Sequence, residues 1–214
     1  MQRAPLAVGL VFGVSLAIVV TLVGPLLLFN PWSTSALQAR HDVPATLNAT
    51  QAEVDRVTGE ILFDLYTDGP FDAALTAQEP LLDEQERSHM HDVAVLVRVL
   101  AAVVLLAAIL AAVTGAWLRG EPRRRGRIML LAAGGIGAVA LLLAGVFAVA
   151  FEPAFAAFHA IFFPPGTYLF AEGSELIVLF PRGFWFDAAL VAGATVVVSA
   201  LVVAVIGLRR WRLI

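Results

Sequence analysis

Long apolar stretches alternate with polar segments along this chain, and four of the stretches are long enough to cross a membrane. They cover residues 1–29, 93–118, 128–151 and 186–208. A helix rises about 1.5 Å per residue, so roughly 20 apolar residues span the hydrocarbon core of a bilayer. Because backbone groups find no water inside lipid, we predict a transmembrane helix for each stretch.

The composition supports this interpretation. The 214 residues are 60% hydrophobic and 14% charged, which is typical of an integral membrane protein and excludes an ordinary soluble domain. The chain has no cysteine, which excludes disulfides, thiol nucleophiles and thiolate metal sites. The first stretch exceeds the roughly 7–15 apolar residues of a secretory signal, and STSALQAR after it is a poor cleavage site, so we expect it to remain as a span.

The placement of arginine predicts the orientation of the spans. Arg3 precedes the first span, five arginines lie in the turn 119–127, and three lie in the tail 209–214. Short segments rich in arginine stay in the cytoplasm, where anionic headgroups are their natural neighbours. Residues 30–92 and 152–185 then face outward. The predicted fold is therefore an all-α membrane protein with four transmembrane helices, a small extracytoplasmic cap and both termini in the cytoplasm.

Two capping boxes mark the starts of helices in the first outward segment. Thr50-Gln-Ala-Glu53 precedes apolar residues at helical spacing, which predicts an amphipathic helix at about 51–67 that ends at Gly69-Pro70. Asp83-Glu-Gln-Glu86 begins a second helix, which continues into the span 93–118. About two turns of this helix, with the sequence ERSHMHDV, then stand above the lipid.

These two turns carry the first candidate functional histidine. On a helix, His89 and Asp92 share a face because they are three residues apart, whereas His91 points nearly the opposite way. We therefore take His89 as the candidate and assign Asp92 and Glu86 to orient it. His91 is expected to face solvent or the membrane interface.

Aromatic residues crowd the second outward segment around a second histidine, His159. The sequence there is FHAIFFPPGTYLF at 158–170, in which Pro164-Pro165-Gly166 forces a turn. A belt at the lipid boundary favours Trp and Tyr, whereas this cluster is mostly Phe, which has no polar group and favours enclosure. We therefore expect a covered substrate pocket, lined by Phe158, Phe162, Phe163, Tyr168, Phe170, Trp185 and Arg98. Arg98 is the exceptional ionisable residue within a predicted span, where it can bind a headgroup or snorkel.

His89 and His159 are predicted to lie at a similar height. The second and third spans are joined by a short turn, so they are antiparallel neighbours with their outer ends close together. Counted outward from that turn, His89 and His159 are about 29 and 32 residues away. If both stretches stay helical, the two histidines then lie at the same height above the turn to within about 5 Å. A single histidine on an apolar face is usually a satisfied core residue, but this pairing favours a shared site.

The motifs at these positions resemble those of a known family. ERSHMHDV at 86–93, FHAIFFPPGTYLF at 158–170 and LIVLFPRGFW at 176–185 resemble the lipoprotein intramolecular transacylase (Lit) family of four-span bacterial membrane proteins. The resemblance implies an enzyme of the bacterial cytoplasmic membrane that needs no cofactor. It acts on a lipoprotein whose N-terminal cysteine bears a diacylglyceryl thioether, and moves the sn-2 acyl chain to the α-amino group of that cysteine. By motif position, the two catalytic histidines of the family correspond to His89 and His159.

Elementary chemistry is compatible with that reaction. An α-amino group has a pKa of about 7.7–8.0 and a free imidazole about 6.5, so a histidine can accept the amine proton near neutral pH. A second histidine can stabilise the oxyanion or protonate the leaving glyceryl oxygen. We assign His159 as the base and His89 as the acid or oxyanion donor, although the sequence is equally compatible with the reverse.

Other function classes have weaker support. A non-enzymatic assembly or partner-binding subunit would use the aromatic residues as its interface and would tolerate loss of both histidines. A metal or haem site would have only His89, His159 and Asp92 as ligands, which is a minimal set, so no metal is predicted. A transporter is disfavoured because the spans hold almost no ionisable residues. The chain has no phosphate loop, dinucleotide motif or nucleic-acid surface, so its expected partners are membrane lipids and the lipoprotein substrate.

Overall fold

The computed structural model describes residues 4–75 and 79–212, and it is all-helical over these residues. Arg3, which contributed to the predicted orientation, lies outside the described residues. The chain divides into two compact units. The first unit comprises Met1–Leu26, Leu100–Val146 and Val191–Ile214, and the second comprises Leu27–Val99 and Phe147–Leu190.

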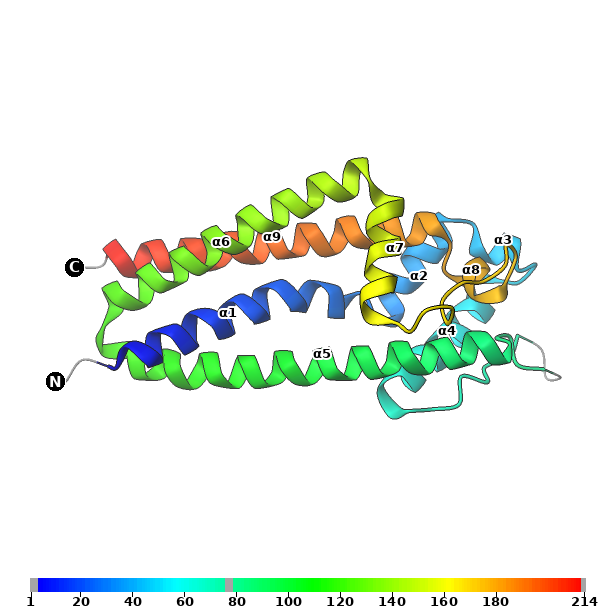
Figure 1. The fold of residues 1–214 in the computed structure, drawn as a ribbon, viewed down its shortest axis with the longest axis horizontal. Coiled ribbons are helices and arrows are strands. Elements are labelled where there is room, and N and C mark those ends of the chain that lie inside the picture. Colours follow the sequence, from blue (N-terminus) through cyan, green and yellow to red (C-terminus); the bar gives the residue numbers. More distant parts are fainter. Residues whose placement is uncertain (1–3, 76–78, 213–214) are drawn as a thin grey trace. The chain divides into compact units, whose positions relative to one another are not determined.

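Within residues 4–75 and 79–212, four helices are long and apolar enough to cross a membrane, which confirms the predicted all-α fold with four spans (Figure 1). They are α1 (Leu6–Leu27), α5 (Glu84–Trp117, extended by the 3₁₀ turn η1, Leu118–Gly120), α6 (Pro122–Val149) and α9 (Arg182–Arg212). The 34 residues of α5 correspond to about 51 Å, which exceeds the roughly 30 Å hydrocarbon core of a bilayer. Its polar first turns, Glu84 to Asp92, therefore precede the apolar stretch that begins at Val93.

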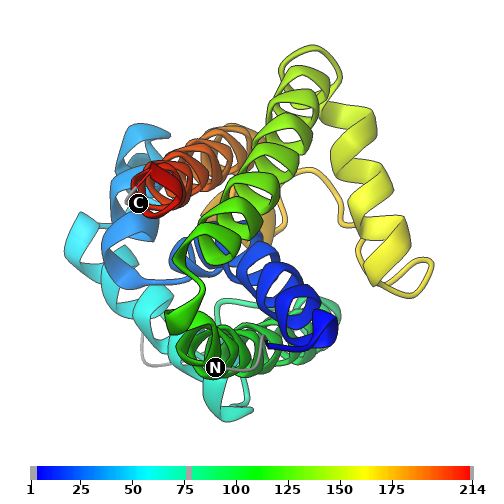
Figure 2. The same ribbon diagram turned by 90° about the vertical axis from the view of Figure 1, so that its left-hand side faces the viewer.

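Figure 2 views the chain from the end where α6 begins and α9 ends. In the first unit, small residues let the helices pack closely. A Cβ atom on Gly126 of α6 would stand 2.6 Å from the carbonyl oxygen of Gly207 of α9, and one on Gly24 of α1 would stand 3.0 Å from the carbonyl oxygen of Ala192. Such contacts between backbones are typical of membrane helices. Many large apolar side chains of this unit are exposed, among them Leu105, Leu142 and Leu201, as expected for surfaces that face lipid.

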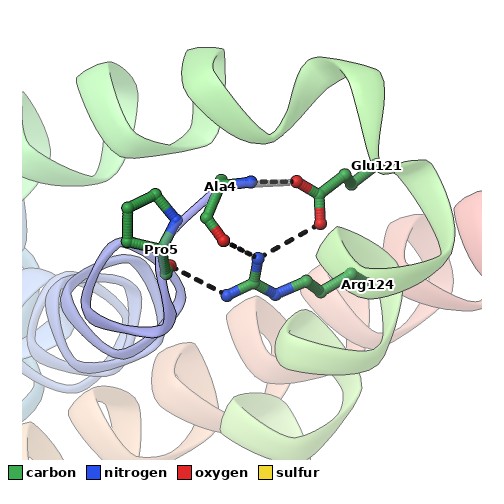
Figure 3. A network of polar contacts seen from close by, with 4 residues as sticks. All are labelled: Ala4, Pro5, Glu121 and Arg124. Atoms are coloured by element: carbon green, nitrogen blue, oxygen red, sulfur yellow. Dashed lines mark hydrogen bonds and ion pairs between the residues drawn. The ribbon is translucent and has the colours of Figure 1, made fainter. Parts of the chain in front are cut away.

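A polar network joins the start of α1 to the start of α6 within this unit (Figure 3). The Glu121 carboxylate accepts a hydrogen bond from the Ala4 N–H at 2.6 Å. The Arg124 guanidinium donates to the carbonyl oxygens of Ala4 at 2.6 Å and Pro5 at 3.0 Å, and pairs with Glu121 at 3.1 Å. Glu121 thus supplies an acceptor for a backbone N–H just before α1. Arg124 adds a charged donor to two carbonyl oxygens there, of which that of Pro5 also accepts from the Val8 N–H at 3.2 Å.

The second unit contains the shorter helices and one main apolar core. The helices are α2 (Pro31–Arg40), α3 (Val43–Thr46), α4 (Gln51–Thr67), α7 (Phe151–Phe162) and α8 (Glu175–Leu179). The apolar stripe of α4 is buried against the start of α5 and against α8, and this core consists chiefly of Val54, Val57, Ile61, Leu62, Leu65, Phe71, Leu82, Met90, Leu176 and Leu179. The second unit is thus organised around α4, which begins at the Thr50–Glu53 capping box.

The end of α4 differs in detail from the predicted stop at Gly69-Pro70. Asp68, not Gly69, has the left-handed backbone (φ 62°) that caps the helix. Gly69 is required for a different reason, because a Cβ atom there would lie 1.9 Å from the Asp64 carboxylate. That carboxylate accepts a hydrogen bond from the Phe71 N–H at 2.8 Å and so fixes the chain as it leaves the helix.

The chain from the third apolar stretch to His159 is not one continuous helix. The predicted match in height of the two histidines assumed a continuous helix, so that estimate does not apply. Helix α6 ends at Val149, Ala150 leaves the helical region (φ −141°, ψ 45°), and α7 starts at Phe151. Pro153 explains the break, because a proline cannot donate to the carbonyl group four residues earlier, that of Val149, and clashes with it. A proline in the first turn of α7 carries no such cost.

We expect Arg124→Gln to destabilise the protein, because two backbone carbonyls and Glu121 would lose a charged partner. Hydrogen bonds to charged groups contribute about 1.5–3 kcal/mol, so a loss of about 2 kcal/mol is expected. The measurement is the thermal unfolding midpoint of the purified protein in detergent. The exposed Arg127, changed to glutamine, is the matched control, and an equal effect of both changes would show that the network contributes nothing beyond charge.

Candidate active site

The two candidate histidines lie together in the second unit. His89 is in the second turn of α5, and His159 is near the end of α7. Their ring centroids are 6.1 Å apart and the ring planes are inclined by 26°. The pairing expected from the sequence is therefore present, although α7 is a separate helix and not the continuation of α6.

A buried carboxylate sets the position of the α5 start. The Glu86 carboxylate accepts a hydrogen bond from the Asp83 N–H at 2.8 Å, and the Asp83 carboxylate accepts one from the Glu86 N–H at 2.8 Å, which together form the predicted capping box. The second oxygen of Glu86 accepts from the Leu176 N–H at 2.9 Å, at the start of α8. Glu86 is 1% exposed. Its two hydrogen bonds join the start of α8 to the start of α5, one turn before His89.

Aromatic rings surround both histidines. The His89 ring centroid lies 4.8 Å from that of Phe163 and 5.5 Å from that of Phe170. His159 has Phe155 at 4.3 Å, Tyr168 at 5.3 Å, and Phe158 and Phe163 at 5.5 Å each. The surroundings are thus mostly apolar, and Tyr168 contributes the one hydroxyl group among these rings.

The other residues assigned to the pocket lie farther from the two histidines. Phe162 contacts Phe158, and the side chains of both are about half exposed. Trp185 is one ring removed from the histidines, 6.2 Å from Phe155. Arg98 forms an ion pair with Asp68 at 2.8 Å, so its immediate partner is the C-terminus of α4.

The hydrogen bond of His159 determines which ring nitrogen carries the proton. Its Nδ1 lies 2.9 Å from the carbonyl oxygen of Phe155, one turn earlier in α7. A carbonyl oxygen only accepts, so Nδ1 must donate and carry the proton. In the neutral ring, Nε2 then has a free lone pair and can act as a base. Phe155, which the sequence does not single out, therefore both packs on His159 and fixes its tautomer.

His89 is in a different environment. Its side chain is 6% exposed, and its Nδ1 atom is buried without a hydrogen-bond partner among the described residues. It lies in the polar turns of α5 that precede the apolar stretch. Burial lowers the pKa of the His89 imidazole to about 4; the charge of His159 adds to this shift and that of Asp92 opposes it. His89 is therefore neutral at pH 7.

Asp92 acts on His89 through its charge. Among the described residues, no hydrogen bond or ion pair joins the two side chains. The helical spacing places Asp92 near His89, as expected, but not in bonding contact. His91 is exposed and packs edge-on against Phe71 at 5.0 Å, away from the paired rings.

Two polar contacts elsewhere in this unit are not evident from the sequence. Gln38 is fully buried and donates to the hydroxyl of Thr58 at 2.9 Å and to the carbonyl oxygen of Leu179 at 3.1 Å. His41 lies 2.9 Å from the Asp187 carboxylate, which also pairs with Arg40 at 2.8 Å. Over residues 4–75 and 79–212, no group of three or more His, Asp or Glu side chains is arranged to hold a metal ion.

Comparison with protein families identifies the class to which this arrangement belongs. The family model of the lipoprotein intramolecular transacylase Lit matches residues 8–185 of this chain. This range includes both histidines and the surrounding aromatic residues. The chain belongs to the Lit family. It is therefore an integral membrane acyltransferase, with the four spans and paired histidines described above.

Solved structures agree with the fold of the Lit family. The integral membrane lipoprotein intramolecular transacylase Lit from Bacillus cereus matches with a TM-score of 0.81 and 18% identity, covering 92% of this chain and 91% of that one. Two variants of the Bacillus cereus protein, with one histidine replaced by arginine or alanine, match with TM-scores of 0.74 and 18% identity over 95% and 94% of this chain and 90% of theirs. No protein with a curated description matches. At this identity the structures show a shared fold.

We expect Glu86→Ala to destabilise the protein markedly, because two backbone N–H groups, of Asp83 and Leu176, would lose their acceptor. A buried donor left unsatisfied costs about 1–3 kcal/mol, so a total of about 2–4 kcal/mol is expected. The measurement is the thermal unfolding midpoint in detergent. Glu84→Ala, in the exposed first turn of the same helix, is the control, and a similar midpoint for both variants would contradict the bridging role of Glu86.

Proposed function

We propose that this protein moves the sn-2 acyl chain of a diacylglyceryl-cysteine lipoprotein to the α-amino group of the same N-terminal cysteine. Membership of the Lit family supports the reaction class. The observation that carries the proposal is the pair of histidine rings 6.1 Å apart within an aromatic enclosure. Both reacting groups belong to one substrate molecule, so no side-chain nucleophile is needed.

His159 is proposed as the general base. Its Nδ1 is bound to the Phe155 carbonyl oxygen, which leaves Nε2 free to take a proton from the neutral amine as it attacks. The amine nitrogen attacks the ester carbonyl, the C–N bond forms, and the C–O bond to the glyceryl oxygen breaks. The proton then passes from His159 to that oxygen, so the reaction needs neither water nor any co-reactant. Proton transfer of this kind contributes about 10²–10⁴-fold.

His89 is proposed as the neutral donor to the oxyanion. Because burial keeps the His89 ring uncharged at pH 7, it acts as an N–H donor and not as a protonated acid. Its Nδ1 has no hydrogen-bond partner among the described residues, so it has no competing protein acceptor there. A donor that is already oriented in apolar surroundings stabilises developing charge strongly.

The aromatic enclosure is proposed to bind the acyl chains and exclude water. Phe163 is buried and contacts both histidine rings. Phe158 and Phe162 are 41% and 50% exposed and present apolar surface beside His159. Water would hydrolyse the ester, so an apolar site favours transfer to the amine. Holding both ends of one substrate in reacting geometry gives a large gain in effective molarity.

The orientation in the membrane is part of this proposal. The arginines of the 119–127 turn and the 209–214 tail favour a cytoplasmic position for those segments. The second unit, with residues 30–92 and 152–185, then faces outward from the bacterial cytoplasmic membrane, where a diacylglyceryl lipoprotein would be reached from the outer leaflet.

We expect His159→Ala and His89→Ala each to lower the transfer rate at least 100-fold, because each removes one of the two groups that handle the proton or the oxyanion. A reporter lipoprotein is co-expressed in cells that lack other N-acylation, and mass spectrometry of its N-terminal lipopeptide locates the acyl chains. His91→Ala is the matched control, since it removes a neighbouring histidine on the other face of α5.

The wild-type protein and His91→Ala should both yield an N-acyl, S-monoacylglyceryl product. An unchanged diacylglyceryl form in the presence of well-expressed wild-type protein would contradict the proposal. Activity retained by either alanine variant at His89 or His159 would instead contradict the two-histidine mechanism.

We expect Asp92→Asn to change the rate at pH 7 less than tenfold. Asp92 raises the pKa of His89, so its loss lowers that pKa further, and His89 stays neutral at pH 7 as before. The measurement is the pH–rate profile of the purified variant on a synthetic diacylglyceryl lipopeptide. A loss as large as that of His89→Ala would instead show that Asp92 orients the ring by a direct hydrogen bond.

A further inference from the structure

The end of the first unit that holds the short turn between α5 and α6 contains an arginine cluster that the proposed reaction does not use. Arg119 lies in η1, Arg125 in the first turns of α6, and Arg210 near the end of α9. Arg210 and Arg119 are close enough to Arg125 for their positive charges to repel it. Arginines from three helical elements therefore lie near one another at this end of the unit.

Close backbone packing brings these charges together. A Cβ atom on Gly126 would lie 2.6 Å from the Gly207 carbonyl oxygen and 2.8 Å from the Trp211 backbone nitrogen. One on Gly207 would lie 2.9 Å from the Gly126 carbonyl oxygen. The glycine pair thus places the backbones of α6 and α9 in direct contact, next to Arg125 in α6 and one turn before Arg210 in α9.

The cluster has no acidic partner in the described part of the chain. Arg124, next to Arg125, pairs with Glu121 (Figure 3). Among the described residues, no carboxylate forms an ion pair with Arg119, Arg125 or Arg210. The guanidinium of Arg125 lies over the Phe12 ring, 5.6 Å from its centroid. The Nε atoms of Arg125 and Arg210 are buried without a hydrogen-bond partner among the described residues.

An anion with several oxygens would accept hydrogen bonds from these arginines and offset their positive charge. A phosphate group accepts hydrogen bonds from several guanidinium groups at once and cancels their mutual repulsion. Trp117 and Trp211, at the ends of α5 and α9, are 66% and 52% exposed. Exposed Trp residues at the ends of spans mark the level of lipid headgroups. The phosphate expected at this level is that of a phospholipid.

We propose that Arg119, Arg125 and Arg210 bind the phosphate group of an anionic membrane phospholipid. The site is independent of the acyl-transfer reaction, because none of its residues takes part in that chemistry. Basic pockets between transmembrane helices are suited to anionic headgroups. The lipid would supply negative charge that no ion pair supplies to these three arginines among the described residues.

The experiment measures binding of dihexanoyl phosphatidylglycerol to the full-length protein in an uncharged detergent, by native mass spectrometry across a lipid titration. We expect Arg125→Gln and Arg210→Gln each to weaken binding about fivefold or more, which is the usual contribution of one arginine near an anionic surface. Arg209→Gln, the exposed neighbour of Arg210, is the matched control and should bind like the wild type.

Two further ligands separate the possible sources of the phosphate. Dihexanoyl phosphatidylcholine should bind at least fivefold more weakly than the anionic lipid, and inorganic phosphate at the same concentration should not displace it. Displacement by inorganic phosphate would overturn the assignment to a lipid. Equal losses in Arg209→Gln and Arg125→Gln would also overturn the proposal, because they would indicate diffuse attraction to the surface.

Arg125→Lys and Arg210→Lys keep the test decisive if a glutamine variant does not fold. Lysine keeps the positive charge but lacks the planar fork that binds two phosphate oxygens. We expect these variants to bind measurably more weakly than Arg209→Lys. Affinities equal to that of Arg209→Lys would overturn the proposal.

Discussion

The carboxylate of Glu86 is the contact on which the candidate site depends. It closes the capping box that starts α5, and it accepts a hydrogen bond from the first turn of α8. The first contact sets where the helix that carries His89 begins, and the second anchors the segment that brings Phe170 against the His89 ring. Glu86 is almost fully buried, so loss of its carboxylate would leave the buried Leu176 N–H without an acceptor. A single side chain thus links the apolar core around α4 to the paired histidines.

The two histidines differ because their surroundings differ. His159 has a backbone acceptor that fixes its tautomer and leaves Nε2 available as a base. His89 is buried among aromatic rings, and its Nδ1 has no protein partner in the described residues. Two copies of one residue type therefore differ in hydrogen bonding and burial, which is why the proposed mechanism gives them different tasks. The sequence contains both histidines but not this difference, since it depends on the Phe155 carbonyl and on burial.

Much of the architecture is evident from the sequence, because apolar stretches and capping boxes are local signals. The four spans and the Thr50 and Asp83 helix starts belong to this group. The break at Ala150 also has a local cause in Pro153, but the apolar run across it hides the signal. The surroundings of the site depend instead on side-chain directions and long-range contacts. Spacing alone could not show that Trp185 is one ring removed or that Arg98 pairs with Asp68.

The break between α6 and α7 gives the chain tolerance to changes in span length. In one continuous helix, each inserted or deleted residue would rotate everything beyond it by about 100° and turn a histidine away from its partner. Ala150 leaves the helical conformation, so the backbone there can absorb such a change. A change in the length of the third span would then leave the local contacts of His159 in α7 intact. The interruption separates the length of the span from the orientation of the histidine beyond it.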